Sequence, residues 1–134
     1  MSYLTLLRVG LALFLSVLCS STLRAQMDGN KLLSECTVTI RHMDTGVSPD
    51  SANQIDDVHC LGFIEGVLEG LVVGEHENPT ATKKPYVCIP DGASLGQNVR
   101  VVVKWMKEHP KDLHRRAALL IYVALLEAYP CPSS

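Results

Sequence analysis

Four cysteines downstream of residue 25 constrain the fold of this chain more than any other feature. They are Cys36, Cys60, Cys88 and Cys131. An even number of cysteines in an exported chain predicts two disulfides, because the compartment is oxidising. A structural zinc site is the alternative, but it calls for close ligand pairs such as C-x2-C. The gaps between these cysteines are 24, 28 and 43 residues, so we favour disulfides over a metal.

Residues 1–25 have the pattern of a secretory signal peptide. Arg8 precedes an apolar run of ten residues, 9–18, and Ala25 supplies the small residue expected before a cleavage site. The run is too short to cross a bilayer core of about 30 Å as a helix. A lipoprotein signal and a retained anchor are alternatives, but a leucine precedes Cys19 and no long apolar stretch is present.

Composition bounds what remains, residues 26–134, to a single small domain. The full chain has 134 residues, of which 47% are hydrophobic, and its formal net charge is −2. This is too apolar and too weakly charged for intrinsic disorder. A pI near 6.2 argues against nucleic-acid binding, which usually requires a basic surplus.

Apolar spacing predicts four helices and hence an all-α fold, a small disulfide-stapled bundle. The predicted helices are about Asp28–His42, about Ala52–Gly74, one opened by the capping box Ser94-Leu95-Gly96-Gln97, and about Pro110–Tyr129. The stretch 117–128 carries only one charge, Glu127. A helix that is apolar nearly all round is buried on most sides, so we expect the fourth helix at the centre of the bundle.

The helix order favours one pairing of the cysteines. Cys88 lies just before the third predicted helix and Cys131 just after the fourth, so these ends meet if the two helices are antiparallel neighbours. Cys36 and Cys60 then link the first two helices. The other two connectivities remain open.

A row of glycines recurs every four residues along the second predicted helix: Gly62, Gly66, Gly70 and Gly74. Each glycine within a helix costs about 1 kcal/mol relative to alanine, so the row implies a compensating contact. Close packing against another helix of the same chain is one explanation. A self-association face is the other.

Charge is distributed unevenly along the chain. Between residues 44 and 77 there are eight acidic residues and no lysine or arginine, whereas from residue 92 onward there are six basic residues and three acidic ones. The acidic stretch is either a solvated helix face or a docking surface for a basic partner. The polar linker 75–87, which is long for a helix connection, is either a passive connector or a binding loop.

Signatures of catalysis and of metal binding are weak. The chain has no G-x-S-x-G elbow, no H-E-x-x-H and no phosphate-binding glycine loop. Asp56 and His59 lie one helical turn apart and could share a metal, but a plain Asp–His contact explains them better. Glu65 and Glu69 have nothing obvious to desolvate them. We therefore expect a protein that is not an enzyme and that holds no cofactor.

Three short blocks resemble the Rap/Tai family of immunity proteins. Cys60-Leu61-Gly62-Phe63-Ile64-Glu65-Gly66 is similar to its C-x-G-[YF]-x-x-G helix, and Cys88-Ile89-Pro90-Asp91-Gly92 followed by Gln97 is similar to its second block. Pro110, Leu113, Ala117 and the terminal Ala128-Tyr129-Pro130-Cys131 are similar to its third. The resemblance covers roughly residues 30–132.

The resemblance implies a periplasmic antitoxin that binds and blocks a peptidoglycan amidase effector of type VI secretion. It also implies a helical fold, two disulfides, dimerisation and no membrane contact after signal cleavage. Inhibition would be steric, through an element that fills the amidase cleft. We expect this element to be the linker, with Trp105 as a second anchor; the linker residues are Glu75, His76, Glu77, Asn78, Lys83 and Lys84. A general periplasmic protein-binding or stress module with the same fold is the alternative.

Overall fold

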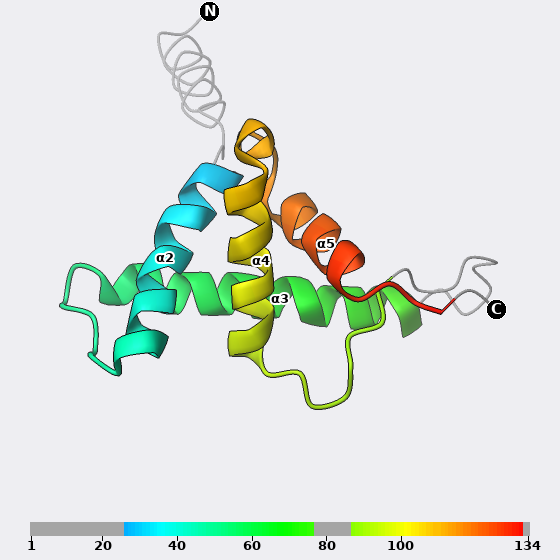
Figure 1. Ribbon diagram of the computed structural model, residues 1–134, viewed down its shortest axis with the longest axis horizontal. Helices are drawn as coiled ribbons and strands as arrows, with labels where there is room; N and C mark the ends of the chain where they lie inside the picture. The colour runs from blue at the N-terminus through cyan, green and yellow to red at the C-terminus, as the bar shows by residue number, and fades with distance from the viewer. Residues whose placement is uncertain (1–25, 77–86, 133–134) are drawn as a thin grey trace, which may run out of the picture.

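Four α-helices and one short 3-10 turn make up the described part of a computed structural model, residues 26–76 and 87–132. The elements are α2 (Gly29–Thr45), α3 (Gln54–His76), α4 (Leu95–Glu108), η1 (Pro110–Asp112) and α5 (Ala117–Ala128). The predicted all-α, four-helix fold is confirmed. Figure 1 shows α2 and α4 side by side, with the long α3 crossing behind them and α5 flanking α4.

Local chemistry defines the helix ends. Asp28 caps α2, because its side chain accepts a hydrogen bond from the Lys31 backbone N–H at 2.9 Å. Gly46 closes the same helix at φ 67°, a left-handed conformation that suits glycine. Ser94 caps α4 as predicted, accepting from the Gln97 N–H at 3.2 Å. The Gln97 side chain does not reach back as a capping box requires; it donates to the Tyr129 hydroxyl at 3.4 Å.

Packing joins all four helices around one apolar core. Its fully buried members include Leu32 on α2, Ile64 on α3, Met106 on α4 and Leu120 on α5, each at 0% exposure. Gly29 lets α2 approach the α4–α5 connection, because a Cβ there would lie 2.9 Å from the Leu113 carbonyl oxygen. Two adjacent hydrogen bonds fix that approach, Gly29 N–H to Arg115 O at 3.0 Å and Ala117 N–H to Met27 O at 2.9 Å.

The fourth predicted helix differs from the structure in two ways. Pro110 begins only a 3-10 turn, and α5 starts at Ala117, because the chain reverses direction between α4 and α5. The expected central position of this helix is also wrong. α5 buries Ala117, Leu120, Ile121, Ala124 and Leu125, but Leu119 on its outer face is 40% exposed, so α5 is one wall of the core.

Candidate functional site

The two disulfides have the favoured pairing and hold the helix scaffold at two points. Cys36–Cys60 joins α2 to α3 and is fully buried. Cys88–Cys131 joins the segment before α4 to the segment after α5, and Cys88 is exposed. The Cys88 N–H also donates to Tyr129 O at 2.8 Å. Each bridge can stabilise the fold by about 2–4 kcal/mol, which makes a rigid platform for surface contacts.

The outward face of α3 carries exposed apolar side chains at both ends and a row of glycines between them, with Glu65 and Glu69 beside the glycines. Its N-terminal end carries Ile55 and Val58, at 74% and 64% exposure, and its C-terminal end carries Val72 and Val73, at 50% and 57%. Such large side chains are usually buried, so their exposure on one helix face marks a contact surface. A shallow hollow lined by Gln54, Ile55, Val58 and His59 adjoins the first end.

The glycine row forms the centre of that face. All four glycines are exposed, and no heavy atom of the described residues lies within 4 Å of the position a Cβ would take, the backbone of α3 aside. The first explanation from sequence, close packing against another helix of the same chain, is therefore wrong for Gly62, Gly66, Gly70 and Gly74. The opposite side of α3 supplies the core contacts through residues such as Cys60 and Ile64.

Two carboxylate–histidine pairs cross the α2–α3 interface in opposite senses. Glu35 of α2, whose side chain is 2% exposed, lies 2.8 Å from His59 Nδ1 on α3. Asp57 of α3, whose side chain is 8% exposed, lies 2.8 Å from His42 Nδ1 on α2. Thr39 adds a hydrogen bond to the Asp57 carbonyl at 3.4 Å. These reciprocal contacts, together with the buried disulfide, fix how α2 packs on α3.

Lys31 completes the first pair from the solvent side. Its ammonium lies 2.9 Å from Glu35 Oε1 and 4.0 Å from Asp56. The hydrogen bond to Glu35 raises the pKa of Lys31 above its ordinary value. The predicted Asp56–His59 contact is therefore replaced by pairs with Lys31 and Glu35. Among the described residues, no group of three histidines, cysteines or carboxylates is placed to hold a metal ion.

The acidic stretch is only partly available to a partner. Asp44 pairs with Arg100 at 2.7 Å, and Asp57 is used inside the α2–α3 interface. Asp50 caps the turn before α3, where the Asn53 backbone N–H lowers its pKa below the ordinary value. Glu65 and Glu69 remain exposed on α3 with no ion pair among the described residues. Of the two interpretations of the acidic stretch, a docking surface would use mainly Glu65 and Glu69 among the described side chains; Glu75 and Glu77 lie outside them.

Trp105 lies in the core rather than on the surface. It is 8% exposed, its Nε1 donates to Glu127 Oε2 at 2.8 Å, and its ring stacks on His109 with centroids 4.0 Å apart. This burial leaves little of the indole for a partner and does not support the predicted anchor. Spacing alone placed Trp105 off the Val99–Val102–Met106 face, but α5 covers that side of α4 as well.

The predicted binding linker falls largely outside the described residues. Glu77, Asn78, Lys83 and Lys84 lie there, as does the signal segment 1–25. Glu75 and His76 end α3, and their side chains are not described. Both flanks of the linker are described: α3 precedes it, and the Cys88–Cys131 bridge follows it.

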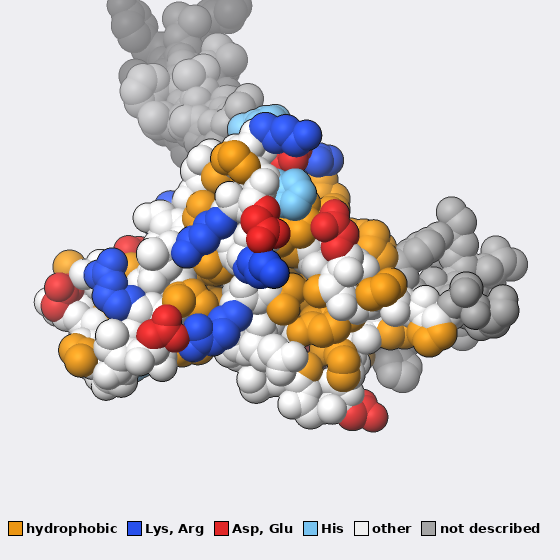
Figure 2. All heavy atoms as spheres, in the orientation of Figure 1, with side chains coloured by type: hydrophobic (Ala, Val, Ile, Leu, Met, Phe, Trp, Pro, Cys, Tyr) orange, Lys and Arg blue, Asp and Glu red, His pale blue; other side chains and the backbone are white. Residues whose placement is uncertain are grey.

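Basic side chains gather on the face opposite the acidic part of α3. Figure 2 shows this face, formed by α2, α4 and α5, with lysines and arginines along α4 and near its C-terminal end and acidic side chains interspersed among them. The sequence signal for this face was the basic surplus from residue 92 onward.

No sequence signal predicted the interfacial role of Glu35, because a glutamate in an amphipathic helix is ordinarily expected on the surface.

Comparisons with known proteins give one match. The family model of the Rap1a immunity proteins matches residues 28–131. No curated protein and no solved structure matches the chain. None of the helices within the described residues is long and apolar enough to cross a membrane. The family match covers more than half of the chain and confirms the resemblance seen in the cysteine, glycine and proline blocks. The chain therefore belongs to the Rap1a immunity protein family.

Proposed function

We propose that this protein is a periplasmic immunity protein that binds and sterically blocks a peptidoglycan amidase effector of type VI secretion. Membership of the Rap1a immunity proteins carries the proposal, because it implies a toxin effector as partner. The family also suggests a protein that acts by binding rather than by catalysis. The amidase as target and the periplasm as compartment are our proposals.

The linker is the element that we propose to enter the amidase cleft. An inserting loop has to be short enough to stay in position and firmly held at both ends, since ordering a free loop opposes binding. α3 holds one end, and the exposed Cys88–Cys131 bridge holds the other. Lys83 and Lys84 give it positive charge, and Glu75 and Glu77 give it negative charge.

Inhibition of the amidase tests this proposal directly. The protein without residues 1–25 is mixed with a candidate peptidoglycan amidase chosen from the products of neighbouring genes, and release of peptidoglycan fragments is followed by mass spectrometry. We expect stoichiometric inhibition, and host protection when both are expressed in the periplasm. A variant with residues 77–84 replaced by an equally long Gly-Ser segment should lose inhibition while keeping its helical circular dichroism. Full inhibition by that variant would contradict the role of the linker.

We further propose that α3 forms a homodimer through its outward face. An antiparallel twofold arrangement brings Gly62 opposite Gly66 of the second copy. Because glycine has no side chain, the two helix axes can then lie closer together than about 8–10 Å, the usual distance between packed helices. The same register sets Ile55 opposite Val73 and His59 opposite Glu69 of the second copy. Apolar ends then meet apolar ends, and the exposed glutamate meets a histidine.

Size-exclusion chromatography with light scattering tests the dimer. Gly66→Leu should give a monomer with unchanged helicity, because Gly66 is exposed and a Cβ there would have no described atom within 4 Å, the backbone of α3 aside. Ala118→Leu, on the exposed side of α5, is the matched control and should stay dimeric. A monomeric wild-type protein, or a dimer that survives Gly66→Leu, would rule out this face.

A general periplasmic protein-binding or stress module is the alternative, and the exposed Ile55 and Val58 favour it. Apolar side chains at 74% and 64% exposure could hold unfolded clients as well as one specific partner. Capture of many unrelated periplasmic proteins by the wild type, with loss in Ile55→Ser/Val58→Ser, would support this alternative. Capture of one amidase alone would support the immunity role.

A further inference from the structure

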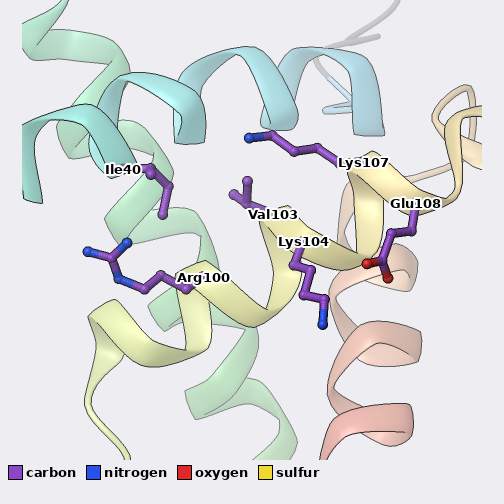
Figure 3. A pocket seen from close by; sticks show the side chains of 6 residues that line it. All are labelled: Ile40, Arg100, Val103, Lys104, Lys107 and Glu108. Carbon is purple, nitrogen blue, oxygen red and sulfur yellow. The ribbon is translucent and has the colours of Figure 1, made fainter. Parts of the chain in front are cut away.

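A basic groove between α2 and α4 lies apart from the outward face of α3. Its volume is about 440 Å³, and its lining is Ile40, Arg100, Val103, Lys104, Lys107 and Glu108. In Figure 3 the Arg100 and Lys107 side chains extend on either side of the apolar pair Ile40 and Val103. The groove therefore has an apolar floor between two cationic ends.

One cation of the groove, Arg100, takes part in an ion pair with a described residue, whereas the two lysines do not. Arg100 pairs with Asp44 at 2.7 Å, with side chains 47% and 52% exposed. Lys104 and Lys107 are exposed, and neither takes part in an ion pair with any other described residue. Val103 is 3% exposed, so core packing explains the apolar residue at this position. Core packing gives no role to the two exposed lysines.

We propose that this groove docks an extended acidic segment of a protein partner, with one apolar side chain between two carboxylates. Arg100 and Lys107 are seven residues apart on α4, a rise of about 10 Å at 1.5 Å per residue. Carboxylates three residues apart in a polyproline II segment lie on one side of it, about 9 Å apart. They match the two cationic ends, and the residue after the first carboxylate lies on the adjacent edge of the segment, where its apolar side chain can rest on Ile40 above the buried Val103.

Charge argues for a peptide over an anionic membrane. Glu108 and Asp44 stand at the groove and repel a uniformly anionic surface, whereas a peptide can place its carboxylates to avoid them. The proposal goes beyond the immunity role, because it requires no particular effector.

The test uses the signal-free protein and a fluorescein-labelled peptide, Pro-Glu-Leu-Pro-Glu-Pro, followed by fluorescence anisotropy. Arg100→Glu/Lys107→Glu should weaken binding by about tenfold or more, since these two side chains are the cationic ends that meet the peptide carboxylates. Lys111→Glu/Arg116→Glu makes the same charge change outside the groove and should bind within about twofold of wild type. Asp44→Asn should bind more tightly than wild type, because it frees Arg100.

Chemical-shift perturbation of labelled protein locates the peptide. We expect shifts confined to α2 and α4 around Ile40 and Val103. Three results would overturn the proposal: no binding to the wild type, equal weakening by the two double variants, or equal binding of the peptide with lysines in place of its glutamates. Binding to phosphatidylglycerol vesicles but not to the peptide would assign the groove to lipid instead. Circular dichroism melts of each variant exclude unfolding as the cause.

Discussion

Removal of the buried Glu35 charge should loosen the α2–α3 interface measurably. The Glu35 side chain is 2% exposed and contacts His59 Nδ1 at 2.8 Å and Lys31 Nζ at 2.9 Å. Glu35→Gln keeps the shape but removes the charge that both contacts use. A hydrogen bond to a charged group contributes about 1.5–3 kcal/mol when buried. His59 is 51% exposed, so water replaces part of that, and we expect a net loss of about 1–2 kcal/mol.

Urea unfolding followed by circular dichroism, with both disulfides intact, measures this loss. In a domain of this size it corresponds to a fall of about 5–10 °C in Tm. Glu69→Gln is the matched control, because that carboxylate is exposed on α3, and it should change the free energy of unfolding by less than about 0.5 kcal/mol. A double-mutant cycle with His59→Gln should show coupling of at least about 0.5 kcal/mol. If Glu35→Gln unfolds like Glu69→Gln, the interface does not depend on this carboxylate, and our account of it is refuted.

Three further predictions concern the scaffold. Limited reduction should open Cys88–Cys131 before Cys36–Cys60, because Cys88 is exposed whereas Cys36 and Cys60 are fully buried; alkylation and mass spectrometry follow the order. Earlier opening of Cys36–Cys60 would contradict the burial that the structure gives to that bridge. Gly29→Ala should lower the free energy of unfolding by about 1–3 kcal/mol, because the added Cβ lies 2.9 Å from the Leu113 carbonyl oxygen, whereas Gly66→Ala should not. Asp50 has a lowered pKa, so its stabilisation is present above its ordinary value of 3.8 and is lost as the pH falls further; Asp50→Asn should show a shallower acid unfolding profile, and an unchanged profile would count against it.

Periodicity and cysteine spacing were sufficient to predict the fold. Apolar spacing predicts the four helices and the Ser94 cap, and the order of the cysteines favours the two disulfide pairs that the structure shows without excluding the other connectivities. The start of α5 does not, because Pro110 suits a 3-10 turn as well as the first turn of an α-helix, and only the packing of the α4–α5 connection decides between them.

The surface was harder to predict, because it depends on which helix face is left uncovered. The sequence of a glycine row is the same whether the row is covered by another helix or faces solvent. In this structure the four glycines of α3 face solvent. Its spacing along α4 set Trp105 off the apolar face of that helix and suggested an exposed side chain. In the structure α5 covers this side of α4, and Glu127 of α5 accepts a hydrogen bond from the indole. In the sequence, Asp57 and Glu35 cannot be told apart from ordinary surface acids of a helix. Each of them reaches a histidine only because α2 packs across α3.

Titration calorimetry between the protein without residues 1–25 and a candidate peptidoglycan amidase effector, chosen from the products of neighbouring genes, tests the central claim most directly. The account predicts saturable binding at a fixed stoichiometry, together with loss of peptidoglycan cleavage at the same protein ratio. No heat of binding, or a complex in which the amidase still cleaves peptidoglycan at its full rate, would contradict it.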